Sequence, residues 1–200
     1  MISVIVPFKE DRGWLNECIM SIRLQTYTDY ELIMAQGPGS LPENFNIGLR
    51  RAKGEFIKMV QDDDWLPEDS LEILAESIGD SIWVVGNVMQ ECSTPYVWKP
   101  SRPFDLESQL EHYDIHMGST LYRTGALRAI GGMDETLLTG EEYDMHLKLL
   151  QYGYRPARVE RVVYHYRMWN GGKSVQFRRY KTEWRKNELK KIRARYLNEV

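Results

Sequence analysis

Short apolar runs alternate with segments of helical periodicity along the first 85 residues of the chain. Runs of this length suit buried parallel strands, and they occupy positions 2–7, 31–35, 55–60 and 81–85. Between them, apolar residues recur every three or four positions, which predicts helices at 15–22, 46–52 and 71–78. The alternation of strand and helix predicts an α/β fold with a mainly parallel central sheet and helices on both faces.

The second half of the chain has a less regular pattern. Positions 90–113 hold Pro95, Pro100 and Pro103, and we expect loops over the sheet there. The remaining predicted elements are a strand at 117–122, a short helix capped by Thr124 and ended by Gly131-Gly132, a helix at 142–152 and a strand at 159–166.

The composition is that of one ordinary domain. Of the 200 residues, 42% are apolar and 28% are charged, and no apolar run is long enough to predict a membrane-spanning helix. The N-terminus indicates a strand rather than a signal peptide. Cys18 and Cys92 are too few for a disulfide framework, so a reducing, cytoplasmic setting is expected. A net charge of −3 argues against a nucleic-acid partner.

Positive charge gathers near the C-terminus. Positions 178–195 contain nine Lys or Arg residues and only two acidic ones, interleaved with aromatic side chains. A solvated helix is the simpler interpretation. A contact with a membrane surface or a partner protein is the alternative.

Three adjacent carboxylates, Asp62, Asp63 and Asp64, follow the third predicted strand. Open α/β sheets bind ligands at the carboxyl ends of their strands. Adjacent carboxylates repel one another unless a cation or hydrogen bonds neutralise them, and hard oxygen ligands suit Mg²⁺ or Mn²⁺. A solvated acidic turn before the next helix is the alternative interpretation.

Two later segments also carry candidate chemistry. Glu141, Glu142 and Asp144 open a predicted helix, where its dipole favours carboxylates and where one of them could also act as a general base. Farther along, His165 could bind a metal or simply pack in the core. Arg167 and Lys173 could neutralise a diphosphate or lie on the surface as ordinary charges.

Five further short motifs occur in a fixed order along the chain. In chain order they are Ser3-Val4-Ile5-Val6-Pro7, Gln25-Thr26-Tyr27, Asn46-x-Gly48, Ala52-x-Gly54-Glu55-Phe56-Ile57 and Gly131-Gly132-Met133-Asp134-Glu135. Together with the two acidic clusters, these segments resemble the inverting glycosyltransferases of family 2, which have the GT-A fold. The resemblance runs in order from Ile2 to about Ser174.

The resemblance implies a division of the chain. A GT-A-type domain would span 1–175, with a nucleotide-sugar-binding half at 1–88 and an acceptor and catalytic half at 89–175. Residues 176–200 would form a basic, helical C-terminal extension.

The resemblance also implies a metal-dependent mechanism. The aspartate triplet would take the place of the DxD motif and hold Mn²⁺ or Mg²⁺, which neutralises the diphosphate leaving group. Asp64 is the first candidate ligand, and Asp62 or Asp63 completes the pair and contacts the donor. Glu142 is the first candidate for the base that deprotonates a hydroxyl of a glycan or other acceptor. Glu141 is the second candidate, and Asp144 would fix the loop by hydrogen bonds.

The donor pocket is expected at the ends of the first two strands. Pro7, Phe8, Glu10 and Gln36 would line it, and Asn46 comes from the family's segment before the acidic motif. A UDP-sugar is the expected donor. The family commonly has Asp-Asp-Gly-Ser after its second strand, whereas this chain has Gln36-Gly37-Pro38-Gly39-Ser40, which weakens the usual argument for uridine.

Two other functions remain open from the sequence. A nucleotidyltransferase acting on a sugar phosphate would also use metal and nucleotide, but it usually carries a glycine-rich basic loop after the first strand, and positions 7–12 have none. A catalytically inactive carbohydrate-binding relative is disfavoured by the intact acidic clusters. No GxGxxG or GxxxxGK[ST] motif supports a dinucleotide or P-loop enzyme.

Overall fold

A computed structural model describes residues 1–172, 175 and 182–197 of the chain. The strands are β1 (Ile2–Phe8), β2 (Tyr30–Gln36), β3 (Phe56–Met59), β4 (Trp83–Glu91), β5 (Tyr96–Trp98), β6 (Thr120–Arg123) and β7 (Ala157–Arg167). The α-helices are α1 (Leu15–Arg23), α2 (Leu41–Arg51), α3 (Ser70–Ser77), α4 (Leu106–Glu111), α5 (Thr124–Ala129), α6 (Glu141–Gln151) and α8 (Thr182–Leu197), with a 3₁₀ turn η1 (Met117–Ser119).

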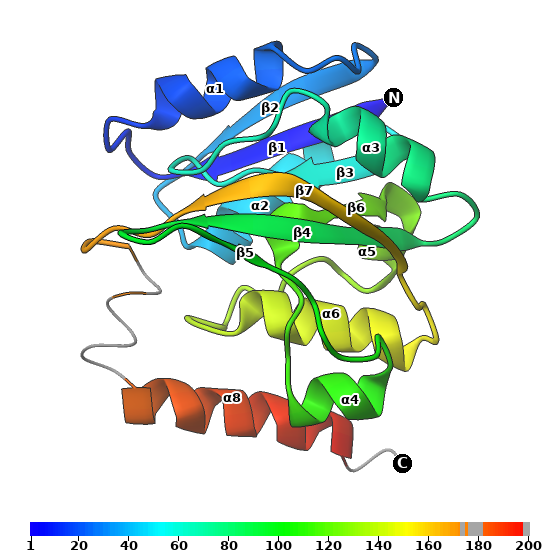
Figure 1. Cartoon of the computed structure of the whole chain (residues 1–200). Helices are drawn as coiled ribbons and strands as arrows, with labels where there is room; N and C mark the ends of the chain where they lie inside the picture. Colours follow the sequence, from blue (N-terminus) through cyan, green and yellow to red (C-terminus); the bar gives the residue numbers. More distant parts are fainter. Residues whose placement is uncertain (173–174, 176–181, 198–200) are drawn as a thin grey trace.

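The strands form one mixed sheet in the order β2-β1-β3-β6-β4-β5, and β7 pairs with β4 (Figure 1). β1 is parallel to β2 and β3, and β4 is parallel to β7. β6 runs antiparallel between β3 and β4, which keeps those two strands pointing the same way. The prediction of a mainly parallel sheet is confirmed, with β6 and β5 as the strands that reverse.

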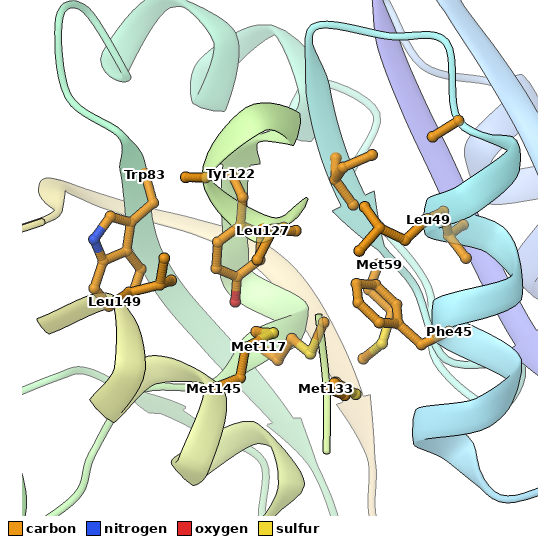
Figure 2. Packing of buried hydrophobic residues seen from close by; sticks show 14 of the residues in the cluster. Phe45, Leu49, Met59, Trp83, Met117, Tyr122, Leu127, Met133, Met145 and Leu149 are labelled. Carbon is orange, nitrogen blue, oxygen red and sulfur yellow. The ribbon is translucent and has the colours of Figure 1, made fainter. Parts of the chain in front are cut away.

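Helices cover both faces of the sheet, as the pattern predicted (Figure 1). On one face, α1 and α3 bury Cys18, Ile22, Leu71 and Leu74 against the strands. On the other, α2, α5 and α6 close a second core whose side chains are shown in Figure 2. That core includes Phe45, Leu49, Met59, Trp83, Met117, Tyr122, Leu127, Met133, Met145 and Leu149. The two cores bury both faces of the sheet, so the ends of its strands are left to present side chains.

A third apolar cluster attaches the C-terminal helix. Ile192 and Tyr196 of α8 are buried against Tyr143 and Leu147 of α6 and Leu110 of α4. In Figure 1, α8 lies beside α6 and α4 on the side away from the sheet. The helix expected in the basic extension is therefore present, and its apolar residues pack inside this chain. Residues 178–181 of the basic segment lie outside the described residues. No helix in the described part of the chain is both long and apolar enough to cross a bilayer.

Two expectations for residues 90–122 are wrong. The stretch at 90–113 contains β5 and α4, because β4 continues to Glu91 and the chain turns back to pair with it. α4 begins where the Asp105 side chain accepts a hydrogen bond from the Ser108 N–H. The strand expected at 117–122 begins only at Thr120, after a 3₁₀ turn.

The second helix starts earlier than its apolar pattern indicated. α2 begins at Leu41 rather than at the predicted Asn46, because Ser40 and Glu43 form a reciprocal capping box at its start. Thr124 is also not a helix cap. It is the first residue of α5, and its hydroxyl donates to the Gly54 carbonyl at 2.7 Å.

Asn46 joins α2 to the loop that follows α5. Its amide nitrogen donates to the Met133 carbonyl at 2.8 Å and to Glu135 at 2.9 Å. Its amide oxygen accepts from the Met133 N–H at 3.0 Å, so the side chain pairs both backbone groups of one buried residue. A buried backbone group left without a partner is costly.

We predict that Asn46→Ala lowers the free energy of unfolding by about 2–3 kcal/mol, because it leaves the two Met133 backbone groups without partners. Urea denaturation followed by circular dichroism measures this loss. Asn16→Ala is the matched control, since Asn16 is exposed on α1 and alanine favours a helix. Equal stability of the Asn46 and Asn16 variants would contradict the assignment.

Candidate active site

A cavity of about 590 Å³ opens at the carboxyl ends of the parallel strands. Pro7 and Phe8 at the end of β1, Asp62 and Asp63 after β3, and Arg167 at the end of β7 all line it. Other walls come from the start of α6 and from α8. This is the position where open α/β sheets bind ligands.

The acidic triplet divides into two roles. Asp64 is buried and does not line the cavity. One of its carboxylate oxygens accepts from the Tyr164 hydroxyl at 2.7 Å, and the other accepts from the Arg167 backbone N–H at 2.8 Å. Burial raises the pKa of Asp64 well above its usual value, and the charge of neighbouring Asp63 adds to this. Asp64 therefore ties the end of β3 to the end of β7.

The other two aspartates face the cavity. The Arg12 guanidinium lies 2.7 Å from Asp62 and 3.5 Å from Asp63. Burial raises the pKa of Asp62, which Arg12 opposes. Trp169 donates its indole N–H to Asp63 Oδ2 at 2.9 Å, whereas the buried Asp63 Oδ1 has no hydrogen-bond partner in the described structure. An unpaired buried carboxylate oxygen fits a cation ligand.

The third predicted cluster is only partly in the cavity. His165 does not line it, because the ring stacks on Trp65 and its Nδ1 lies 2.6 Å from Glu91 Oε1. Arg167 does line it, but its guanidinium is held by the Asp63 carbonyl at 2.9 Å and by Glu17 at 2.5 Å. Lys173 lies outside the described residues.

No group of three His, Cys, Asp or Glu side chains that could enclose a metal occurs within the residues described. Magnesium-type sites that use one or two carboxylates and complete their shell with substrate phosphates do not need such a group. Asp63, with Asp62 beside it, therefore suits a cation that arrives with a phosphorylated ligand.

The start of α6 supplies the acidic side chains of the opposite wall. Glu141 and Glu142 both line the cavity, and the Met117 N–H donates to Glu142 Oε2 at 3.3 Å. Gly140 precedes them with φ of 76°, and a side chain there would collide with Leu189 and Ile192 of α8. Glycine thus allows α8 to approach the helix start closely.

Asp144 points away from the cavity and is fully buried. Its carboxylate accepts from the Tyr196 hydroxyl at 2.8 Å and from Arg195 at 3.1 Å, and Lys148 lies 2.9 Å away. These contacts fix α6 to α8, whereas the sequence expectation was that Asp144 fixes the loop.

The residues expected around the nucleotide are also divided. Pro7, Phe8 and Glu10 line the cavity, whereas Gln36 and Asn46 do not. Gln36 is exposed and donates to the Lys9 carbonyl at 3.4 Å. Asn44, two residues before Asn46, is in the wall instead. Its amide donates to the carbonyls of Phe8 and Gly37, both at 3.1 Å.

An aromatic wall of the cavity was missed by the sequence pattern. His116 lies between Trp98 and Tyr166, with ring centroids 6.1 Å and 5.1 Å away. Burial lowers the pKa of His116 to about 3, so the ring is neutral. Arg12 was also missed, and α8 adds Arg185, Leu189 and Arg193. These side chains come from separate segments, so no spacing in the sequence connects them.

Comparison with known proteins gives consistent relatives, although no family model matches the chain. A PGL/p-HBAD biosynthesis glycosyltransferase of Mycobacterium bovis is 26% identical over 196 residues, covering 82% of this chain and 74% of its own length. Glycosyltransferase GlyG of Streptococcus pneumoniae is 28% identical over 116 residues, covering 44% of this chain and 38% of its own length.

Solved structures match over most of the chain. TarS residues 1–349 of Staphylococcus aureus, in complex with UDP-GlcNAc, superposes with a TM-score of 0.69 at 19% identity, covering 86% of this chain and 59% of that one. The mannosyltransferase PcManGT of Pyrobaculum calidifontis, with GDP-Man and Mn²⁺, gives a TM-score of 0.60 at 19% identity and covers 86% and 58%. The fold is of the GT-A type. The chain spans less than two thirds of these two structures and of GlyG.

Proposed function

We propose that this chain is a metal-dependent, inverting glycosyltransferase that moves a sugar from a nucleoside diphosphate sugar to a hydroxyl acceptor. The observation that carries the proposal is the pairing of two acidic walls across one cavity. The unpartnered Asp63 Oδ1 lies on the strand side, and Glu142 lies on the α6 side. The first suits a phosphate-bound cation, and the second suits a base.

The cation-holding residues we propose are Asp63 and, beside it, Asp62, in the role of a DxD motif. Mn²⁺ or Mg²⁺ held there would supply charge to neutralise the departing diphosphate. Arg12 now neutralises both aspartates, so it must give way or share them when a cation binds. Asp64, the first candidate from the sequence, positions this pair from behind, because both of its oxygens already accept hydrogen bonds.

The base we propose is Glu142. Its carboxylate lines the cavity at the first turn of α6, and the Met117 N–H holds one oxygen, which orients the other. A base here would take the proton of the acceptor hydroxyl as its oxygen attacks the anomeric carbon from the face opposite the diphosphate. Glu141 is the second candidate, since it also lines the cavity but is more buried.

The donor pocket we propose lies at the end of β1. Phe8 and Glu10 both lie in the cavity wall. The Phe8 ring would stack on the nucleobase of the donor, and the Glu10 carboxylate would accept hydrogen bonds from the ribose hydroxyls. We favour a UDP-sugar as donor, and the UDP-GlcNAc bound by TarS is compatible with this choice. The GDP-Man bound by PcManGT makes GDP the necessary comparison.

We predict that Asp63→Ala removes the Mn²⁺-dependent part of UDP binding, because it deletes the unpartnered carboxylate oxygen of a residue in the cavity wall. Asp64→Asn should retain that part and instead lower the melting temperature, because Asn cannot accept both hydrogen bonds as a carboxylate does. Calorimetric titration of UDP with Mn²⁺ and with EDTA measures the first effect. The reverse pattern, with Mn²⁺ dependence lost only in Asp64→Asn, would return the metal role to Asp64.

We predict that Glu142→Gln slows sugar transfer by about 10²–10⁴-fold, the usual contribution of a general base, because the amide cannot accept the proton. The affinity for the donor should stay unchanged, since the substitution preserves size. The measurement compares initial rates with whichever nucleotide sugar gives turnover. Glu141→Gln is the matched control, and a large loss in that variant alone would move the base to Glu141.

A further inference from the structure

Four arginines line the cavity, and they differ in what neutralises them. Arg12 is paired with Asp62, and Arg167 with Glu17. Among the described residues, Arg193 on α8 donates only to neutral oxygens, the Tyr143 hydroxyl at 3.2 Å and the Glu111 carbonyl at 3.3 Å. The two arginines at the strand ends therefore have carboxylate partners, whereas the cavity wall formed by α8 carries excess positive charge.

Arg185, also on α8, is the cavity arginine with the fewest partners among the described residues. It lines the cavity, its Nε is buried, and that atom has no hydrogen-bond partner. Within the part of the chain that the structure describes, its guanidinium has neither a hydrogen bond nor an ion pair. A partly buried cation without a partner lowers stability, and a ligand oxyanion would compensate through charge-assisted hydrogen bonds.

The position of Arg185 on α8 assigns it to one side of the cavity. Arg185, Leu189 and Arg193 are spaced four residues apart, so they share one face of the helix. Leu189 lies against Gly140, and Arg193 contacts Tyr143, so this face adjoins the start of α6. That is the wall of Glu142 and not the wall of the aspartates.

We propose that α8 supplies an anion-binding subsite for the acceptor, so that the acceptor carries a negatively charged group, a phosphate or a carboxylate, near its reacting hydroxyl. This inference rests on the proposed function, because only a transfer reaction has an acceptor. Arg185 binds the anionic group, and Arg193 adds positive charge about 12 Å farther along the helix.

Three small probes test the subsite: glucose 6-phosphate, glucuronate and neutral glucose. Their dissociation constants are measured by calorimetry or ligand-observed NMR in EDTA, without nucleotide, so that no metal can bind the phosphate. Wild type should bind at least one anionic probe on the order of tenfold tighter than glucose, as expected for one charge-assisted hydrogen bond. Whichever anion is preferred identifies the group.

The variants separate a specific site from general charge. Arg185→Gln should abolish the preference, and Arg185→Lys should retain part of it. Lys190→Gln removes one exposed charge of α8 outside the cavity lining and should leave the preference intact. No preference in wild type, or equal loss in Lys190→Gln, would overturn the subsite.

Binding of UDP and GDP with Mn²⁺ is measured on the same proteins. Unchanged nucleotide affinity in Arg185→Gln supports an acceptor subsite, whereas a loss of nucleotide affinity with the anion preference retained would assign Arg185 to the donor and overturn the inference. If wild type binds neither nucleotide but still prefers the anionic probe through Arg185, the proposed function fails and the anion site stands.

Discussion

The site depends on the hydrogen bonds that the buried carboxylate of Asp64 accepts. The carboxylate accepts hydrogen bonds from the Tyr164 hydroxyl and the Arg167 backbone N–H. The same tyrosine oxygen accepts a hydrogen bond from the Gln61 N–H at 3.1 Å. These bonds join two strand ends that are about 100 residues apart in sequence. Because these hydrogen bonds are buried, they fix the segment after β3. The neighbouring residue Asp63 therefore lies in the cavity wall rather than on a free loop.

The opposite wall repeats this arrangement. Asp144 is buried and bonded to Arg195 and Tyr196 of α8, while Glu141 and Glu142 on the same helix turn face the cavity. Each acidic motif thus combines a carboxylate that holds the structure with others that line the cavity. In each motif of three acids, one carboxylate therefore serves the structure and two lie in the cavity wall. This arrangement also makes α8 a wall of the site, since the Asp144 bonds keep that helix against α6.

The sheet and its helices could be predicted from the sequence, because buried strands and amphipathic helices leave periodic apolar patterns. The start of α2 at Leu41 was missed because its capping residues, Ser40 and Glu43, lie in a stretch rich in glycine and proline. Both acidic motifs are visible in the sequence, and the structure places residues of each in the wall of one cavity. What spacing could not show is which carboxylate of each motif is buried, since Asp64 is selected by Tyr164 and Arg167, which are distant in sequence. Arg12, His116 and Arg185 were missed for the same reason: each reaches the cavity only through tertiary packing.

The central claim is that a divalent cation binds at Asp63 together with a nucleoside diphosphate. Anomalous diffraction from crystals grown with Mn²⁺ and UDP tests it most directly. We predict one manganese peak in the cavity within coordination distance of Asp63 Oδ1, with phosphate oxygens of UDP completing its shell and Arg12 displaced. Bound UDP without manganese in the cavity, or manganese at Asp64 or His165 instead, would contradict the claim.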